Sequence, residues 1–355
     1  MLVSGRSLAQ PRVVVEGGLA LAQVYDDDVF AVPGLRSPDD FWRLMPHLGL
    51  GLRTPRLTLD ARYEMAAETY RRHDALDDPL AAQDASLALG WSPTRRLTAE
   101  TKLAYAEART PGALNTVTGL EAGRLGARRL QAAQSLAWRG GARTRAIVDA
   151  SALSEDAGGR FRTDTVSVGA TLERRWGASD AGRLAYRASR FATDGTVVFS
   201  HAVVAGWTRD LDRPTRLEFE VGPRFSGHTV GAEVAASLRH RFAHGEAAVT
   251  CLQTQTTVVG EPGPVLARGL TVTLSRQVLR SVSFVAAPSA FRVQGRGSSE
   301  VNRLDLEVAW RVARRFSVAA SHQLSRQTGA LGGAPGAPFV HNVVMLRAVT
   351  TVAGK

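Results

Sequence analysis

Apolar and polar residues alternate along most of this 355-residue sequence, and this period of two constrains the fold more than any other feature. In the segment 57–68, every odd position from Leu57 to Ala67 is apolar, while most even positions, such as Asp60 and Arg62, are polar. Successive side chains of a β-strand point to opposite faces, so the segment predicts a strand with one apolar and one charged face. The same alternation recurs at 217–225, 304–312 and 316–325.

Two kinds of connection separate the alternating segments. Tight turn signals rich in Pro, Gly and Arg occupy 53–56, 92–95, 139–143, 210–214 and 243–245. They alternate with longer connections that are richer in Asp, Gly and Pro, at 26–40, 71–79 and 110–128. Strands are therefore predicted near 13–25, 41–52, 56–69, 80–92, 97–108, 128–139, 143–153, 161–174, 182–192, 196–209, 214–225, 228–243, 245–257, 264–276, 279–293, 299–312, 315–327 and 338–350.

An even number of strands, about 18 within a range of 16–18, returns both chain ends to the same side of a closed barrel. The pattern thus predicts an all-β protein, a transmembrane antiparallel up-and-down β-barrel with short periplasmic turns and longer extracellular loops. We expect one barrel domain at 13–350, a C-terminal tail at 351–355, and a remnant of a signal peptide or an N-terminal extension at 1–12. A soluble β-sandwich or solenoid is the alternative fold.

Composition excludes several other classes. No stretch approaches the roughly 20 consecutive apolar residues of a membrane-spanning helix. The net charge of +11 first suggests nucleic acid, but the arginines are spread along the chain without a basic cluster or a reading motif, so no nucleic-acid partner is predicted. A single cysteine, Cys251, can form no internal disulfide.

The tryptophans provide a separate test because the strand prediction does not depend on them. Aromatic rings prefer the headgroup level of a membrane, where one edge meets lipid and the other meets water. All but one fall at or just past the ends of even-numbered predicted strands, before a tight turn. The predicted membrane-interface belt consists of Trp91, Trp138, Trp176, Trp207 and Trp310 at that side and Trp42 at the other.

Alternate residues of each strand share one face of the sheet, and we call each such set a phase. If the apolar phase faces lipid, the opposite phase faces the lumen. The predicted pore-lining residues are Asp60, Arg62, Glu64, Glu100, Lys102, Glu218, Glu220, Arg224, Glu233, Arg239, Arg241, Asp305, Glu307 and Arg311. A barrel of this size encloses a water-filled channel unless a loop or plug occupies it. Both signs of charge are present, so strong ion selectivity is not predicted, and the rows could equally be a structural ladder of cross-strand ion pairs.

Two connecting segments could modify the lumen. The Ala-rich segment 113–134 fits either an extended loop or a short helix folded over the pore. The run Asp26-Asp27-Asp28 could collect divalent cations, but it lacks the ligand spacing of a calcium loop, which favours a solvated loop. No metal site and no cofactor are predicted.

A lipid-modifying hydrolase is the enzymatic alternative. His201, His240 and His322 lie in the lipid-facing phase, and Ser200, Ser237, Ser321 and Ser325 are near them in sequence. No Gly-x-Ser-x-Gly signature accompanies them, so the prediction is that the chain is not an enzyme and has no catalytic residues.

Several segments resemble one family. Tyr25–Phe30, Pro46–Leu50 and Pro55–Tyr63, followed by Thr110–Asn115, Ala205–Thr208 and Val221–Phe225, resemble outer-membrane β-barrels associated with bacterial exopolysaccharide and PEP-CTERM systems. The similarity runs over nearly the whole chain and contains no catalytic motif. It implies a barrel in the outer membrane of a Gram-negative cell, with a role in polysaccharide export or the cell envelope. The chain departs from such barrels by ending in 349–355 without a terminal aromatic residue, which weakens the prediction of the last strand.

The resulting hypothesis is a porin-like or exopolysaccharide-export-associated barrel that transports hydrophilic solutes. Its expected partners are outer-membrane lipid and lipopolysaccharide, with polysaccharide-export components as a further possibility. A structural cell-envelope barrel with an occluded lumen is the main alternative.

Overall fold

The computed structural model describes residues 12–32, 36–115, 117–121, 123–227, 229–331 and 334–354. More than three quarters of them belong to one 18-stranded antiparallel sheet. The strands are β1 (Arg12–Asp26), β2 (Asp39–Arg53), β3 (Leu57–Tyr70), β4 (Asp78–Trp91), β5 (Leu97–Ala108), β6 (Ala127–Arg139), β7 (Thr144–Ala157), β8 (Phe161–Arg175), β9 (Asp180–Thr193), β10 (Thr196–Asp210), β11 (Thr215–Ser226), β12 (Thr229–Phe242), β13 (Gly245–Thr256), β14 (Val265–Leu279), β15 (Val282–Gln294), β16 (Ser298–Ala313), β17 (Phe316–Leu331) and β18 (Ala334–Gly354). Two short helices, the 3₁₀ helix η1 (Asp74–Leu76) and α1 (Pro111–Leu114), lie in connections.

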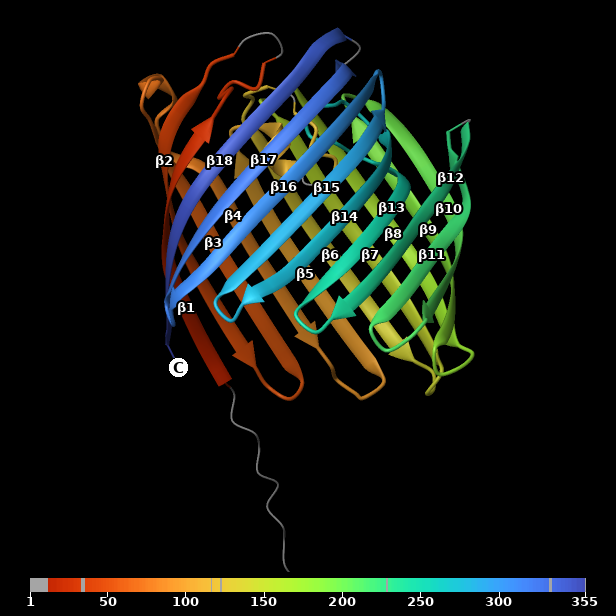
Figure 1. The fold of residues 1–355 in the computed structure, drawn as a ribbon. Helices are drawn as coiled ribbons and strands as arrows, with labels where there is room; N and C mark the ends of the chain where they lie inside the picture. Colours follow the sequence, from red (N-terminus) through yellow and green to blue (C-terminus); the bar gives the residue numbers. More distant parts are fainter. Residues whose placement is uncertain are drawn as a thin grey trace, which may run out of the picture.

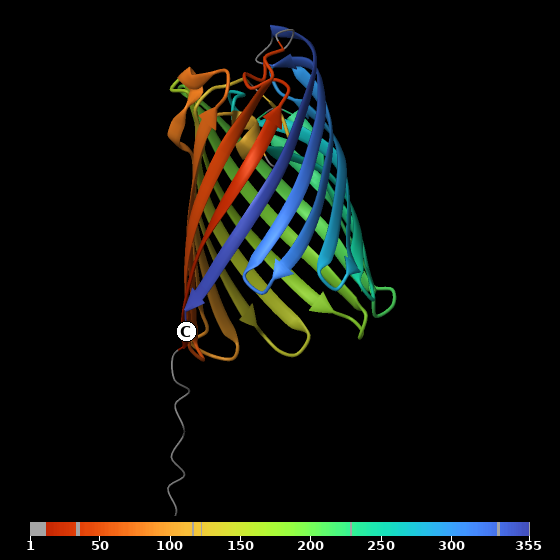
Figure 2. The ribbon, with the colours of Figure 1, turned by 60° about the vertical axis from the view of Figure 1, so that its left-hand side comes forward.

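The sheet closes on itself. Each strand pairs with the next one along the chain, and β1 pairs with both β2 and β18, as Figure 2 shows at the seam between the first and last strands. The seam is in register from Val15 opposite Gly354 to Asp26 opposite Val343. Closure leaves no unpaired sheet edge, which is the condition for a sheet to cross a lipid bilayer. The predicted barrel with about 18 strands is confirmed.

The two ends of the barrel differ in their connections. Tight turns gather at the lower end in Figure 1, where the described chain also begins and ends. We call this end periplasmic, because outer-membrane barrels place their short turns and their termini there. Long connections at the opposite, extracellular end are confirmed for 27–38, 71–77, 109–126 and 257–264.

Other extracellular connections are tight, and those after β9 and β11 coincide with the short gaps between the predicted strands 182–192 and 196–209 and between 214–225 and 228–243. The links after β7, β9 and β11 are as tight as the periplasmic turns. Asp194 and Gly195 form one such hairpin, and both have positive φ angles of 46° and 80°. Most strands are 12–16 residues long, longer than the 9–11 that a bilayer needs, so the sheet itself extends beyond the bilayer.

The predicted C-terminal tail at 351–355 is also corrected. Thr351–Gly354 continue β18, because the start of β1 offers them a partner, with Thr351 opposite Gly18. The expectation for residues 1–12 falls almost wholly outside the described residues, since only Arg12 is described and it begins β1.

The outer face is apolar and the inner face is polar, as the period-two pattern predicts. Leu48, Val148 and Leu346 point outward with more than half of their surface exposed. A soluble protein rarely exposes a continuous apolar band, whereas a lipid-facing wall requires one. No helix in the described part of the chain is long and apolar enough to span a membrane.

The buried apolar residues lie inside the barrel, near its extracellular end. One cluster joins Ala22 and Val24 of β1 to Phe41 of β2 and Tyr70 of β3, and Val343 and Met345 of β18 pack against it across the seam. A second joins Leu114 of α1 to Ala108, Ala127, Ala157 and Val259, and a third joins Leu120 to Val258, Val265, Val293 and Val301. The segments 109–126 and 257–264 therefore fold into the barrel, and Figures 1 and 2 show the first of them within the ring of strands.

Candidate functional site

The inserted segment 109–126 identifies the inner face of the sheet. Arg129 of β6 donates to the carbonyl oxygen of Leu114 at 2.6 Å, and the Gln327 amide of β17 donates to the carbonyl oxygen of Glu121 at 3.1 Å. Because side chains alternate along each strand and the register is known for every pair, these contacts fix the inner phase around the ring. That phase contains all the predicted pore-lining residues, namely Asp60, Arg62 and Glu64 on β3, Glu100 and Lys102 on β5, Glu218, Glu220 and Arg224 on β11, Glu233, Arg239 and Arg241 on β12, and Asp305, Glu307 and Arg311 on β16.

In the periplasmic half of the barrel several of these inner charges are open to water, whereas Glu220 is buried and paired with Arg183 and Arg187. The side chains of Glu100 and Lys102 are 52% and 61% exposed although they point into the lumen, and they pair with each other at 2.9 Å. Arg239 and Arg241 are exposed to a similar degree and share Glu246 at 3.2 and 3.1 Å. Inward side chains can be this exposed only where the interior is hydrated, so the periplasmic half encloses a charged, water-accessible space.

In the extracellular half, inner charges are buried and paired. Glu68 accepts two hydrogen bonds from Arg43, at 2.8 and 2.6 Å, and one from the Tyr70 hydroxyl at 2.7 Å. Glu155 accepts two from Arg129, at 2.9 and 2.6 Å. These carboxylates have only 7% and 3% of their side-chain surface exposed. Arg224 and Glu233 form a third such pair at 3.1 Å.

The connection 109–126 crosses the lumen and is held by amide side chains. Asn115 donates to the carbonyl oxygens of Leu120 and Val259 and accepts from the Val259 amide, each at 2.9 Å. The Gln327 side chain accepts a hydrogen bond from the backbone amide of Glu121 at 2.9 Å and donates one to the backbone carbonyl of the same residue. A neighbouring β-strand would satisfy these two backbone groups in the same way. These two side chains satisfy loop backbone groups that water cannot reach.

The side chain of Arg124 also ties the same connection to Tyr70 of β3 and to Val29, which follows β1. Arg124 donates to the carbonyl oxygen of Val29 at 3.2 Å and to the Tyr70 hydroxyl at 3.1 Å, and its guanidinium lies 5.2 Å from the Tyr70 ring centre. Glu121 is buried by this packing, and the burial raises the pKa of its carboxyl. Of the segment 113–134, the part before 127 belongs to a loop within the barrel that begins with the short helix α1, whereas 127–134 form part of β6, which corrects the prediction for that part.

Arginines concentrate at the periplasmic mouth on the wall from β6 to β11. A cavity of about 510 Å³ there is lined by Arg139, Arg143, Arg145, Arg175, Arg183 and Arg216, against the carboxylates Glu173 and Glu218. Arg145 and Arg216 face those two carboxylates at 3.8 and 2.7 Å, and Arg183 pairs with Glu220. Arg139, Arg143 and Arg175 form no ion pair with any carboxylate in the described residues. Charges of both signs line the lumen as a whole, but positive charge is concentrated on this part of the wall. The order of residues in the sequence did not show this concentration.

The predicted aromatic belt lies outside the lumen. Trp91, Trp138 and Trp310 lie on the outward phase near the periplasmic end, each about half exposed. Trp207 is also there, and its indole nitrogen donates to Asp180 at 3.2 Å, while Trp176 follows β8 at the turn. Trp42 lies on the outward phase at the extracellular end with 52% of its surface exposed. This arrangement is the one that ring placement at two headgroup layers requires.

The residues considered for a hydrolase lie on opposite faces of the wall. His201, His240 and His322 point outward, whereas Ser200, Ser237, Ser321 and Ser325 point inward. His201 pairs with the Tyr186 hydroxyl and His240 with the Thr215 hydroxyl, each at 2.8 Å. A nucleophile and its base must meet within hydrogen-bond distance, and these serines and histidines do not. Cys251 also points outward and is exposed.

The residues that pair and pack inside the extracellular half were not among those predicted from the sequence. Glu68, Arg129 and Glu155 continue the alternation that identified their neighbours, so the pattern could have found them. The contacts of Asn115 with Val259 and of Glu121 with Gln327 join residues 144 and 206 positions apart, and no local signal predicts them.

Comparison with known proteins supports the fold. No family model and no curated protein matches the sequence. The solved structure of OpdQ from Pseudomonas aeruginosa aligns with a TM-score of 0.50 and 11% identity over 96% of this chain and 98% of that chain. OpdK from Pseudomonas aeruginosa, solved with vanillate, aligns with a TM-score of 0.50 and 10% identity over 96% of this chain and 99% of that chain.

The closed sheet, the apolar outer wall and the fold shared with these structures lead to one location. A closed antiparallel barrel with an apolar exterior satisfies its backbone inside lipid and exposes its polar face only to its own lumen. The chain is an integral β-barrel of the bacterial outer membrane.

Proposed function

We propose that the chain is a porin-like channel through which hydrophilic solutes cross the outer membrane. The observation that carries the proposal is the hydrated, charged inner wall of the periplasmic half, where Glu100 and Lys102 point inward and remain more than half exposed. A barrel that serves only as a structural element has no need of a water-accessible charged interior. The comparisons support the fold of such a channel and do not specify its solute.

Conductance in planar bilayers tests the proposal. The purified full chain should give step-like current increments in salt solution, because ions follow the hydrated wall. A barrel that inserts with the correct strand content but conducts no current at any voltage, with or without the connection 109–126, would overturn the channel.

The arginine-lined cavity at the periplasmic mouth favours anionic solutes within this function. Arg139, Arg143 and Arg175 lie beside it without partner carboxylates in the described chain. Guanidinium groups bind carboxylates and phosphates by bidentate hydrogen bonds, and a mouth of one sign raises the local concentration of the opposite ion.

Reversal potentials in a salt gradient measure this preference. Replacing Arg139, Arg143 and Arg175 together with Gln should lower the anion-to-cation permeability ratio about two- to fivefold. The matched control replaces Arg190, Arg268 and Arg326, which carry the same total charge on the outward phase, and should leave the ratio unchanged. Equal effects of the two triple variants would contradict a luminal role.

The structural barrel with an occluded lumen remains the second candidate, because 109–126 crosses the interior and buries Leu114 and Leu120. It predicts a silent wild-type protein that conducts once the connection is shortened. That outcome separates it from the channel, which conducts in both forms.

The sequence resemblance to barrels of exopolysaccharide and PEP-CTERM systems suggests one solute class. Under this part of the proposal, acidic oligosaccharides enter the periplasmic mouth and block ion current, with the arginine-lined cavity as the point of contact. Current that is unaffected by neutral and acidic oligosaccharides would remove this solute class and leave the channel itself intact.

A further inference from the structure

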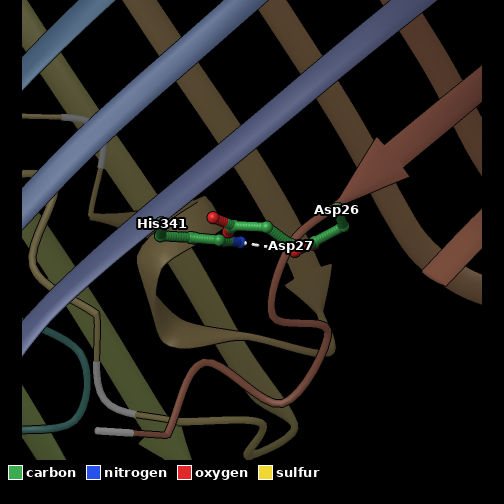
Figure 3. A group of neighbouring side chains, drawn as sticks. All are labelled: Asp26, Asp27 and His341. Carbon is green, nitrogen blue, oxygen red and sulfur yellow. Dashed lines mark hydrogen bonds and ion pairs between the residues drawn. The ribbon is translucent and has the colours of Figure 1, made fainter. Parts of the chain in front are cut away.

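We propose that Asp26, Asp27 and His341 bind a divalent transition-metal ion such as Zn²⁺ at the seam where the barrel closes. The site is independent of conduction, since it lies in the buried extracellular half. One ligand atom from each of the three residues lies within 4.8 Å of the other two, and Figure 3 shows the side chains converging between β1 and β18.

The three residues are brought together by the closing register. Asp26 is the last residue of β1 and faces inward, and His341 faces inward from β18. Asp27 follows directly, and its carboxylate accepts from the Asn342 backbone amide at 2.7 Å and from the Asn342 side-chain amide at 2.8 Å. Those two bonds fix the carboxylate beside His341 while leaving a lone pair on each of its oxygens.

His341 is buried, and only one of its two ring nitrogens has a hydrogen-bond partner. The residue is only 8% exposed, and Nε2 hydrogen-bonds to Asp26 Oδ1 at 2.8 Å. Its other nitrogen, Nδ1, is buried without a hydrogen-bond partner and faces Glu121 Oε1 at 4.0 Å. A buried imidazole nitrogen without a partner is costly, so its retention calls for a second state in which it is satisfied.

Metal binding supplies that state. The ion replaces the Nε2 hydrogen bond to Asp26, the ring proton moves to Nδ1, and Nδ1 then donates to Glu121 after a small closure. Metal-bound histidines usually donate their second N–H to a carboxylate in this way, which fixes the ring. The charge balance is also favourable, because a dication would lie among the carboxylates of Asp26, Asp27 and Glu121.

The buried carboxylate of Asp28 also favours positive charge at this place. Asp28 is only 2% exposed, its Oδ1 has no hydrogen-bond partner, and its charge interacts with Asp26 and His341. Burying several carboxylates close together is unfavourable unless positive charge compensates them, and a dication would add to the compensation that His341 and Arg303 provide. One imidazole with carboxylates matches the ligands of Zn²⁺, whose bonds of about 2.0–2.2 Å require only a modest contraction of the cluster.

A second histidine–aspartate pair at the same end provides a matched control. His73 Nδ1 also lies 2.8 Å from a carboxylate oxygen, that of Asp39. Asp39 accepts in addition from the backbone amides of Asp40, Arg72 and His73, whereas Asp26 accepts from that of Asp28 alone, and the described neighbourhood shows no convergent carboxylates around Asp39. This pair is complete without an ion.

The test is Zn²⁺ binding to the untagged full chain in detergent, after removal of metal with EDTA and dialysis. Calorimetric titration should give one Zn²⁺ per chain. His341→Gln, Asp26→Asn and Asp27→Asn should each weaken binding by at least about tenfold, Glu121→Gln by about tenfold, and His73→Gln should bind as the wild type does. Circular dichroism and heat-dependent gel migration identify variants that fail to fold.

X-ray absorption of the zinc-loaded wild type keeps the proposal falsifiable if a variant misfolds. A shell of oxygen and nitrogen ligands with a single imidazole supports the site. Absence of Zn²⁺ binding at about 100 μM, a shell with several imidazoles, or unchanged affinity in a folded His341→Gln variant would overturn it.

Discussion

The periplasmic and extracellular halves of the barrel interior follow the same strand alternation but differ in what covers it. Glu100 and Lys102 form an ion pair in the periplasmic half with more than half of each side chain exposed, whereas Glu155 in the extracellular half is 3% exposed and tightly bound by Arg129. The wall supplies similar residues in both places. The inserted loop residues that lie against Glu155 and Arg129 account for the burial of this pair.

This difference separates two roles within one sheet. Where the wall is uncovered, charged side chains are free to interact with passing ions. Where 109–126 and 257–264 fold inward, the same kinds of residue become structural, because a buried carboxylate must be paired to remain stable. If the chain is the proposed channel, the extracellular half sets the width of the route and the periplasmic half sets its electrostatics.

Removing the inserted connection 109–126 should abolish the difference in water access between the two halves. Of the changes considered, we expect this one to have the largest effect on function. We expect replacement of 111–123 by a short Gly-Ser linker to raise single-channel conductance at least about twofold, because a barrel of this strand number is wide when no loop fills it. Planar-bilayer recording measures the change.

The control is a Gly-Ser replacement of η1 at the same end, which contains no buried residue and should leave conductance unaltered. Conductance that stays at the wild-type level after loss of 111–123 would show that this connection does not limit the route.

Neutralising a carboxylate in each half should sharpen the contrast in stability. Glu155→Gln replaces a buried carboxylate paired with the partly buried Arg129, and breaking such a pair costs up to about 3–5 kcal/mol. Glu100→Gln removes an exposed partner of Lys102, which should cost less than about 1 kcal/mol. Urea unfolding in lipid vesicles, followed by tryptophan fluorescence, gives both free energies.

The two variants have the same chemical change, so a difference between them reports on the environment. Similar losses for Glu155→Gln and Glu100→Gln would contradict the assignment of a dry extracellular half and a wet periplasmic half.

A smaller effect is expected from the amide that anchors the loop. Asn115→Ala leaves the amide and carbonyl groups of Val259 without their partner, and each buried unsatisfied group costs about 1–3 kcal/mol. Hydrogen exchange of the Val259 amide should accelerate markedly. Asn302→Ala, on the exposed outward phase, should leave it unchanged, and equal exchange in both variants would show that Asn115 does not hold the loop.

The wall was predictable from sequence because its signal is local. Alternation over 57–68 alone places Asp60 and Arg62 on one face, and the repetition of this pattern with turn signals yields the strand order. The tight extracellular hairpin at Asp194–Gly195 was also within reach of the sequence, since these residues tolerate positive φ.

The closure of the extracellular half was not predictable in the same way. Val259 meets Asn115 and Gln327 meets Glu121 only after the ring has closed, and His341 meets Asp26 across 315 positions. Such contacts depend on register around the whole barrel. A single sequence does not encode them in any short pattern, and for this reason the acidic run at 26–28 suggested only a solvated loop.

The most direct test of the central claim, that the inward face of the periplasmic half carries the current, is chemical modification during recording. The only cysteine, Cys251, points outward, so Cys251→Ser provides a background without thiols. In that background, a negatively charged, membrane-impermeant thiol reagent should change the single-channel current of Lys102→Cys, which points inward, and not that of Leu103→Cys, its outward neighbour. A current that responds equally at both positions, or at neither, would contradict the claim.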